Sequence, residues 1–275
     1  MYQGYKIGLA LSGGGAKGIA HLGVFKALEE RGIVVDHISG VSAGAIMGAL
    51  YADGNTPEDI CKFIKKSNLY RMVSLTMPTN GGFTQMDQFG SFIEKKLKAK
   101  TFGELRIPLV VNAAELTTGK NVYFEEGNLI EGIMASANVP IFFRPMKIGD
   151  KQYVDGGIFC NLPVSVLRRK GCQIIIGVHV NPITHEDGFD GLFDVSERVF
   201  HLAVNGNTVS QKRDCDIIIE TREAQKYGMF DASKAEEIFK VGYNAANNVL
   251  DKVDWDEVKT KVRISAGFSP FYRKA

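Results

Sequence analysis

The stretch "HISGVSAGAI", His37 to Ile46, indicates how the first part of this chain folds. Its first four residues have strand character, and the small apolar residues after Ser42 favour a helix. So sharp a bend needs glycine on both sides and makes the side chain between them project, as in the Gly-x-Ser-x-Gly nucleophile elbow. Chance matches to so short a motif are also expected in a chain with 30 glycines. The predicted elbow comprises the nucleophile Ser42 and its neighbours Gly40, Val41, Ala43 and Gly44.

The chain as a whole has the composition of an ordinary globular protein, with 275 residues of which 45% are hydrophobic and 23% charged. We expect one domain over 1–275, in which a motif-bearing core of about 5–165 is completed by strands and helices of 172–275. A net charge of +2 is too small to indicate a nucleic-acid partner. The sequence does not indicate an oligomeric state.

Cysteines and apolar runs bear on the expected compartment. The four cysteines show no CxxC or CxxH spacing, so neither a zinc site nor a disulfide framework is indicated. The N-terminal apolar run is short and broken by glycines, unlike a signal peptide. The longest apolar stretch, Ile38 to Ala52, is shorter than the roughly 20 residues of a bilayer span. These features predict a cytoplasmic protein.

Predicted strands and helices alternate along the chain, and several strands are continuously apolar. This pattern predicts an α/β fold with a mostly parallel sheet covered on both faces. We expect strands at 6–11, 37–40, 108–114, 122–124, 152–154, 174–180 and 217–220, and helices at 43–50, 56–67, 87–97, 163–170, 194–209 and 234–250, besides one ending near Arg31. The segment Leu69–Met86 lacks a clean period, and a mobile apolar lid and an ordinary surface loop are both consistent with it.

A glycine-rich loop follows the first strand and has two interpretations. Its residues Gly13, Gly14, Gly15, Ala16, Lys17 and Gly18 satisfy the GxGxxG pattern. With Asp36 as a ribose-binding acid, the loop predicts a dinucleotide-binding oxidoreductase. Alternatively, bare glycine N–H groups beside Ser42 form an oxyanion hole, aided by the N-terminus of the following helix. Loop and elbow then meet at the carboxyl ends of neighbouring parallel strands, which favours the second interpretation.

A serine nucleophile needs a base within hydrogen-bonding reach. His179, His185 and His201 follow in the order of α/β-hydrolases, but none lies in a special turn, and a structural role is favoured for each. Asp155 is the better candidate, because a short strand delivers it onto Gly156 and Gly157. An aspartate with a raised pKa can accept the serine proton. An ordinary Asp-Gly hairpin turn is the alternative.

Three motifs in one order, GGGAKG, GVSAG and DGG, with "ASANVP" at 135–140, resemble the patatin-like phospholipase family from about Lys6 to Leu162. The resemblance implies an αβα sandwich and lipid acyl hydrolysis by a Ser42–Asp155 dyad, with oxyanion donors in the Gly13–Gly15 loop and Lys17 at a position where members carry Lys or Arg. It implies neither a metal nor an organic cofactor. A catalytically silent lipid-binding protein is a further alternative.

Two apolar segments suggest contacts with lipid. Ile141, Phe142 and Phe143 follow the ASANVP segment and are candidates for an acyl channel, with packing beneath the sheet as the alternative. The tail "GFSPFYRKA" combines aromatic and cationic side chains, a composition that suits peripheral contact with a membrane surface, whereas docking on the body of the protein is favoured over it. The expected ligand is therefore a lipid or another ester.

Overall fold

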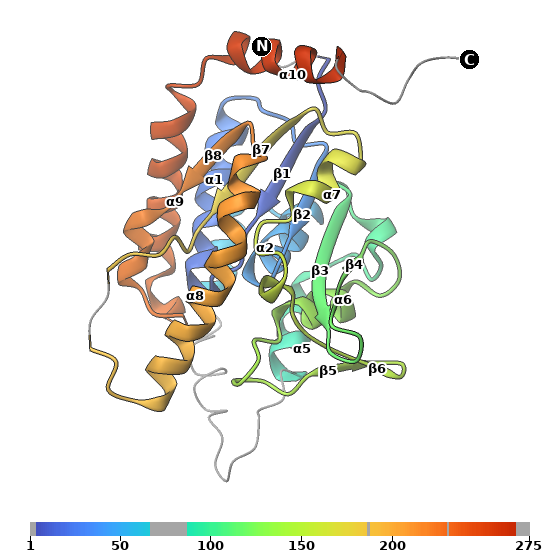
Figure 1. The fold of residues 1–275 in the computed structure, drawn as a ribbon, viewed down its shortest axis with the longest axis vertical. Helices are drawn as coiled ribbons and strands as arrows, with labels where there is room; N and C mark the ends of the chain where they lie inside the picture. Colours follow the sequence, from blue (N-terminus) through green and yellow to red (C-terminus); the bar gives the residue numbers. More distant parts are fainter. Residues whose placement is uncertain (1–3, 67–86, 186–187, 230, 268–275) are drawn as a thin grey trace.

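The computed structural model describes residues 4–66, 87–185, 188–229 and 231–267. The segment Leu69–Met86, considered above as a lid, lies outside the described residues, as does all of the tail after Gly267. The fold is built on an eight-stranded sheet in the order β5-β6-β3-β2-β1-β7-β8, with β4 paired to β3 (Figure 1). The strands are β1 Ile7–Leu11, β2 His37–Gly40, β3 Leu109–Glu115, β4 Lys120–Phe124, β5 Met146–Ile148, β6 Lys151–Asp155, β7 Ile174–His179 and β8 Ile217–Glu220.

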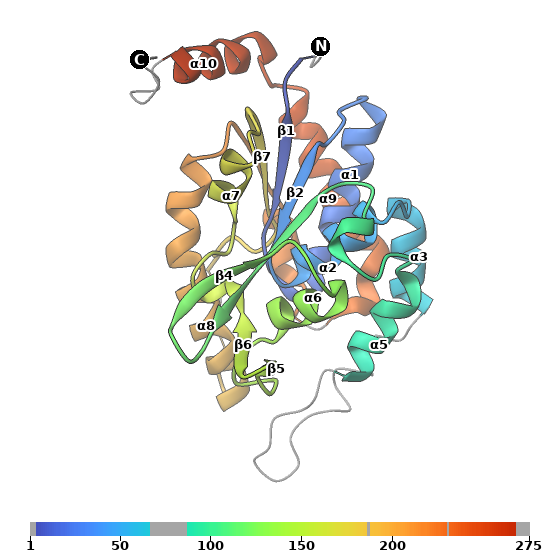
Figure 2. The same ribbon diagram turned by 90° about the vertical axis from the view of Figure 1, so that its right-hand side faces the viewer.

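The five strands from β3 to β8 along this order run parallel. β4 and β6 each pair antiparallel with β3, and β5 pairs antiparallel with β6. The expected mostly parallel α/β sheet is therefore confirmed. Figure 2 shows helices on both sides of it, with α7 and α8 opposite α1, α2, α3 and α9. The helices are α1 Ala20–Glu30, α2 Ala43–Ala52, α3 Pro57–Lys66, α5 Asp87–Lys96, α6 Leu129–Ala137, α7 Val164–Arg169, α8 Leu192–Arg213, α9 Ala235–Leu250 and α10 Trp255–Gly267.

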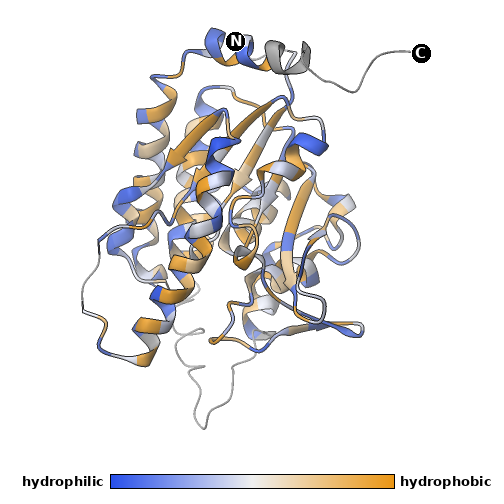
Figure 3. Ribbon diagram, viewed as in Figure 1, coloured by the Kyte–Doolittle hydropathy of each residue, from blue (hydrophilic) through white to orange (hydrophobic). Residues whose placement is uncertain are grey.

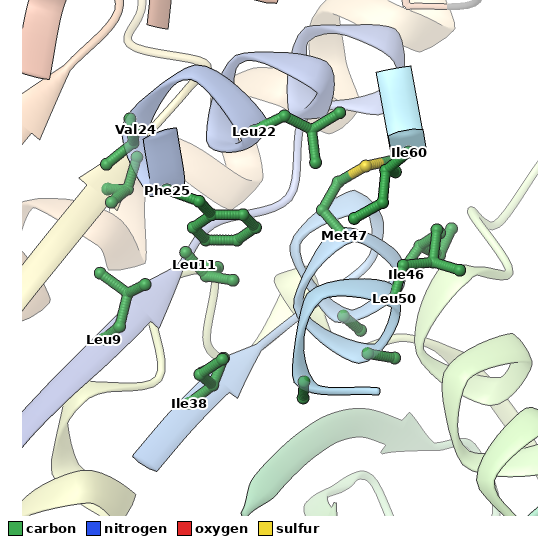
Figure 4. Close-up of a cluster of buried hydrophobic side chains, with 14 of the residues drawn as sticks. Leu9, Leu11, Leu22, Val24, Phe25, Ile38, Ile46, Met47, Leu50 and Ile60 are labelled. Carbon is green, nitrogen blue, oxygen red and sulfur yellow. The ribbon is translucent and has the colours of Figure 1, made fainter. Parts of the chain in front are cut away.

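Figure 3 shows that the central strands are apolar along their length. Both of their faces are buried, as these unbroken apolar runs require. On β1, Leu9 and Leu11 belong to the large core beneath α1, α2 and α9, whereas Ala10 belongs to a second core beneath α7. This alternation follows the two-residue period of a strand. Figure 4 shows part of the large core, where Leu9, Leu11 and Ile38 of the sheet lie near Phe25 and Leu50. The sheet is thus the middle layer of an αβα sandwich.

Three elements were not expected from the sequence: α6, α10 and β5. The signal for α6 is present in retrospect, because Asn128 caps this helix by accepting a hydrogen bond from the Glu131 N–H at 3.1 Å. Similarly, the Asp254 carboxylate accepts hydrogen bonds from the N–H groups of Asp256 and Glu257 at the start of α10. The three residues of β5 depend on pairing with β6, which no local pattern reveals.

Candidate active site

The predicted elbow is a tight turn between β2 and α2. Ser42 has φ 53° and ψ −124°, a conformation that residues with side chains rarely adopt. A Cβ on Gly40 would lie 2.7 Å from the backbone of Gly44, and one on Gly44 would lie 2.5 Å from the Leu11 carbonyl oxygen. Both glycines are therefore required by packing. Backbone strain like that at Ser42 is typical of functional sites.

The structure brings Ser42 and Asp155 together. Asp155 ends β6, is only 2% exposed, and accepts a hydrogen bond from the Ser42 hydroxyl. Its Oδ1 also accepts one from the Gly157 N–H at 2.8 Å. Burial raises the pKa of Asp155 to about 6, although both hydrogen bonds act in the opposite direction. This carboxylate is consequently a stronger base than an exposed aspartate, and it is ionised at neutral pH.

The end of α6 holds both members of this pair. The buried hydroxyl of Ser136 accepts a hydrogen bond from the Ser42 N–H at 2.8 Å. Two residues later, the Asn138 carbonyl accepts one from the Asp155 N–H at 2.8 Å. The ASANVP segment therefore fixes the backbone of the elbow relative to that of the carboxylate. Reasoning from the sequence included this segment in the family resemblance but missed its positioning contacts.

The glycine-rich loop lies beside the Ser42 hydroxyl, since a Cβ on Gly13 would lie 3.7 Å from Ser42 Oγ. Several loop N–H groups are already engaged. That of Gly13 donates to Asn161 Oδ1 at 3.1 Å, that of Ala16 to the Met229 carbonyl at 2.6 Å, and that of Lys17 to the Gly14 carbonyl at 3.2 Å. Among the described residues, the N–H groups of Gly14 and Gly15 make no hydrogen bond. Within the Gly13–Gly15 set expected as oxyanion donors, the N–H of Gly13 thus has a protein acceptor, and those of Gly14 and Gly15 do not in the described part of the chain.

Two further loop residues serve packing and internal hydrogen bonding. Lys17 is buried, and its ammonium group donates to Asn181 Oδ1 at 3.0 Å and to Gln225 Oε1 at 3.3 Å. Gly18 lies against Ala43 at the start of α2, where an added Cβ would come within 2.5 Å of the Ala43 Cβ. These contacts join the loop to the elbow and to the segment after β7.

An apolar pocket of about 680 Å³, open solvent included, begins at Ser42 and the glycine-rich loop. Of the three candidate acyl-channel residues, Phe143 lines this pocket. Ile141 is instead 55% exposed and Phe142 half-buried, and neither contributes to the lining. The other lining side chains, which sequence reasoning missed, come from several helices and loops: Ile19, Ala43, Ile46, Met47, Ile64, Phe89, Ala137, Val139, Met229 and Ala232.

A second, smaller pocket, about 320 Å³ with open solvent included, also contains Ser42, and we call it the polar chamber after its polar side chains. The two pockets share Ser42, Gly15, Val139 and Met229, so the hydroxyl lies where they meet. The side chains of the polar chamber differ in chemistry from those of the apolar pocket: Asp155, Asn161, Asn181 and His201, with Phe200 and Val204. An ester bound at Ser42 would therefore meet apolar surroundings on one side and a mixture of polar and apolar side chains on the other.

The histidines occupy different environments. His179 Nδ1 lies 3.2 Å from Glu220 Oε1, and His21 Nε2 lies 2.9 Å from the Ser12 carbonyl oxygen, so one ring nitrogen of each has a structural partner. Their other ring nitrogens are buried and have no hydrogen-bond partner among the described residues, but neither residue lines a pocket with Ser42. His185 is exposed. His201 differs, because α8 carries it to the polar chamber. The structural role that the sequence favoured for His201 does not explain this position near Ser42.

The geometry contradicts the dinucleotide interpretation of the loop. Asp36 precedes β2, and its carboxylate accepts a hydrogen bond from the N–H of Ile7 at 2.7 Å, at the start of β1. The glycine-rich loop follows the other end of β1 and begins at Gly13, six residues after Ile7, or roughly 20 Å at the rise of a strand. The acid therefore cannot bind a ribose whose phosphates lie on the loop.

The protein has three αβα layers, and its candidate site combines a strained serine elbow, a buried carboxylate and a glycine-rich loop. These features define the class of α/β proteins with a candidate hydrolase site. Comparison with known families identifies it further. The model of the patatin-like phospholipase family matches residues 9–168. The chain therefore belongs to the patatin-like phospholipase family.

Similar proteins are found among curated sequences and solved structures. Lysophospholipase NTE1 of Saccharomyces cerevisiae is 30% identical over an alignment of 276 positions that covers 87% of this chain and 16% of that protein. The Kluyveromyces lactis protein of the same name is 28% identical over an alignment of 279 positions that covers 90% of this chain and 19% of that protein. The chain thus spans less than a fifth of the length of these relatives.

Two solved structures share the fold. Human GIVD cytosolic phospholipase A2 matches with a TM-score of 0.55 and 10% identity, over 96% of this chain and 60% of that one. VipD from Legionella pneumophila matches with a TM-score of 0.53 and 17% identity, over 90% of this chain and 67% of that one.

In the described ranges, no helix has both the length and the apolarity needed to cross a membrane.

Proposed function

We propose that this chain is a serine hydrolase that cleaves carboxylic esters of lipids through an acyl-enzyme. The hydrogen bond between the Ser42 hydroxyl and the buried Asp155 carboxylate, at the junction of the two pockets, carries the proposal. Membership of the patatin-like phospholipase family supports it. Because the apolar pocket leads away from Ser42, we assign it to the acyl chain, and Phe143 to its wall.

The reaction then proceeds in two steps. Asp155 accepts the Ser42 proton while Oγ forms a bond to the ester carbonyl carbon, and the N–H groups of Gly14 and Gly15 hold the oxyanion. The bond to the alcohol breaks, and the alcohol leaves with the proton from Asp155. Water next attacks the acyl-enzyme and gives its proton to Asp155, and the carboxylic acid leaves as the proton returns to Ser42.

The substrate class that we propose is a monoacyl lipid, including lysophospholipids. One apolar pocket accommodates one acyl chain, and the polar chamber on the other side of Ser42 suits a hydrophilic alcohol. The name of the curated relatives, lysophospholipase, agrees with this class. We further propose that residues 1–275 fold as one domain, because β7 and β8 extend the sheet formed by the motif-bearing part.

The test combines covalent labelling with product analysis. A fluorophosphonate probe should label the wild type and spare Ser42→Ala, and the wild type should release fatty acid from lysophosphatidylcholine. Ser39→Ala is a matched control, because Ser39 is also buried but donates to the Pro163 carbonyl. Labelling that persists in Ser42→Ala would refute the nucleophile. Vesicle binding without hydrolysis of any ester would instead support a silent lipid-binding protein.

A further inference from the structure

His201 is a buried histidine to which the mechanism above gives no role. It is 7% exposed and lines the polar chamber together with Ser42 and Asp155. Its Nε2 atom is buried and has no hydrogen-bond partner among the described residues. A buried polar atom without a partner is unfavourable, and most such atoms in folded proteins are paired. An orphaned imidazole nitrogen beside a candidate nucleophile therefore suggests a ligand.

The other polar side chains of the chamber are already engaged with protein atoms. Asn161 accepts from the Gly13 N–H, and its Nδ2 donates to Thr208 Oγ1 at 3.3 Å. Asn181 Oδ1 accepts from the ammonium group of Lys17. Asp155 accepts from Ser42 and Gly157. His201 is thus the chamber side chain with an unused buried nitrogen.

The helix that carries His201 is tied to the candidate active site. Asn207 on α8 donates to the carbonyl oxygens of Gly157 at 2.8 Å and Ile158 at 3.0 Å, directly after Asp155. Its Oδ1 accepts a hydrogen bond from the Asn161 N–H at 3.0 Å. These bonds fix α8 against the loop of the carboxylate, so the imidazole is held in place relative to Ser42.

The imidazole is neutral over the physiological range, because burial and the nearby Lys17 and Arg198 lower the pKa of His201 to about 3. A neutral imidazole has one nitrogen that donates a hydrogen bond and one that accepts. A hydroxyl group also donates and accepts, so it can pair with either nitrogen of the ring. A cation or an anion would find no opposite charge on this ring.

We propose that His201 contacts the substrate in the polar chamber and hydrogen-bonds a free hydroxyl group on the alcohol half of the ester. The inference rests on the proposed function, since the acyl chain must occupy the apolar pocket for the alcohol to lie in the chamber. It specifies the alcohol as a polyol, such as the glycerol part of a monoacyl lipid. Proton transfer stays with Asp155, and His201 contributes to binding and specificity.

The experiment compares two esters with the same acyl chain, 2-hydroxyethyl octanoate and propyl octanoate. The alcohol half ends in a hydroxyl group in the first ester and in a methyl group in the second. Since they share an acyl-enzyme, deacylation is common to both, and the ratio of their kcat/KM values reports the alcohol half. We expect His201→Leu to lower this ratio (hydroxyethyl over propyl) roughly three- to tenfold, the equivalent of one hydrogen bond. His201→Gln, which can still donate and accept, should restore part of it.

The control is His185→Leu, an exposed histidine outside the chamber, which should keep the wild-type ratio. If His201→Leu slows both esters equally, the residue is merely structural and the proposal is overturned. If the wild type hydrolyses neither ester, the proposed function fails instead.

A second measurement uses the wild type alone, in case His201→Leu does not fold. Ethylene glycol and propanol are compared as acceptors of the octanoyl group from the acyl-enzyme. By microscopic reversibility, the chamber should favour ethylene glycol over propanol roughly three- to tenfold. Equal transfer to both alcohols would contradict the proposal.

Discussion

Replacing Asp155 with asparagine tests whether burial of the ionised carboxylate, which makes the group more basic, also destabilises the folded protein. Asparagine has the same shape, its oxygen can accept from the Gly157 N–H, and its amide can donate to Ser42 Oγ. Packing and hydrogen bonding are thus preserved while the charge is removed. We expect hydrolysis to fall at least a hundredfold, because the base is lost.

The magnitude of the stability effect follows from the raised pKa. The folded state shifts the pKa of Asp155 from 3.8 to about 6, and each unit corresponds to about 1.4 kcal/mol. Because the folded protein binds this proton more tightly, the group stabilises it below pH 4, and that stabilisation is lost as pH rises through 6. Above pH 7 the ionised, buried carboxylate therefore costs about 3 kcal/mol that Asp155→Asn avoids.

The assay is urea unfolding of the wild type and Asp155→Asn at pH 4 and pH 8. The difference in unfolding free energy between the two proteins should shift by about 2 to 3 kcal/mol in favour of Asp155→Asn from pH 4 to pH 8. Titration of every other group is common to both proteins and cancels. A difference independent of pH, or one favouring the wild type at pH 8, would refute the reasoning about burial.

Three other predictions concern the site. The wild-type kcat/KM should rise with pH through an apparent pKa near 6, since the ionised carboxylate is the active form; a flat profile from pH 5 to 8 would exclude Asp155 as the base. Ser136→Ala should slow hydrolysis at least tenfold, because the Ser42 N–H loses its acceptor, with Ser39→Ala as the control for losing a buried hydroxyl. Gly15→Ala should lower the melting temperature and abolish hydrolysis, since φ is 57° and the added Cβ would lie 2.3 Å from the Met229 carbonyl oxygen, whereas Gly103→Ala, with open space around it, should do neither.

Local patterns in the sequence predicted most of the strands and helices, except α6, α10 and β5, and the motifs at their ends. The continuous apolar runs at β1, β3 and β7 can be buried only in a sheet covered on both faces, so they predicted its class. The glycines around Ser42 predicted a tight bend, because only glycine avoids the clash there. Motif order placed the glycine-rich loop and the elbow after neighbouring parallel strands.

Only the tertiary structure decided which groups meet at Ser42. Asp155 reaches the hydroxyl because β6 pairs antiparallel with β3, a register fixed by contacts between segments distant in sequence. Contacts between distant segments also determine which loop N–H groups are hydrogen-bonded. They likewise bring His201 from α8 to the polar chamber. A residue's type and its immediate neighbours specify its local conformation, whereas burial and hydrogen bonding depend on partners that the chain brings together only on folding.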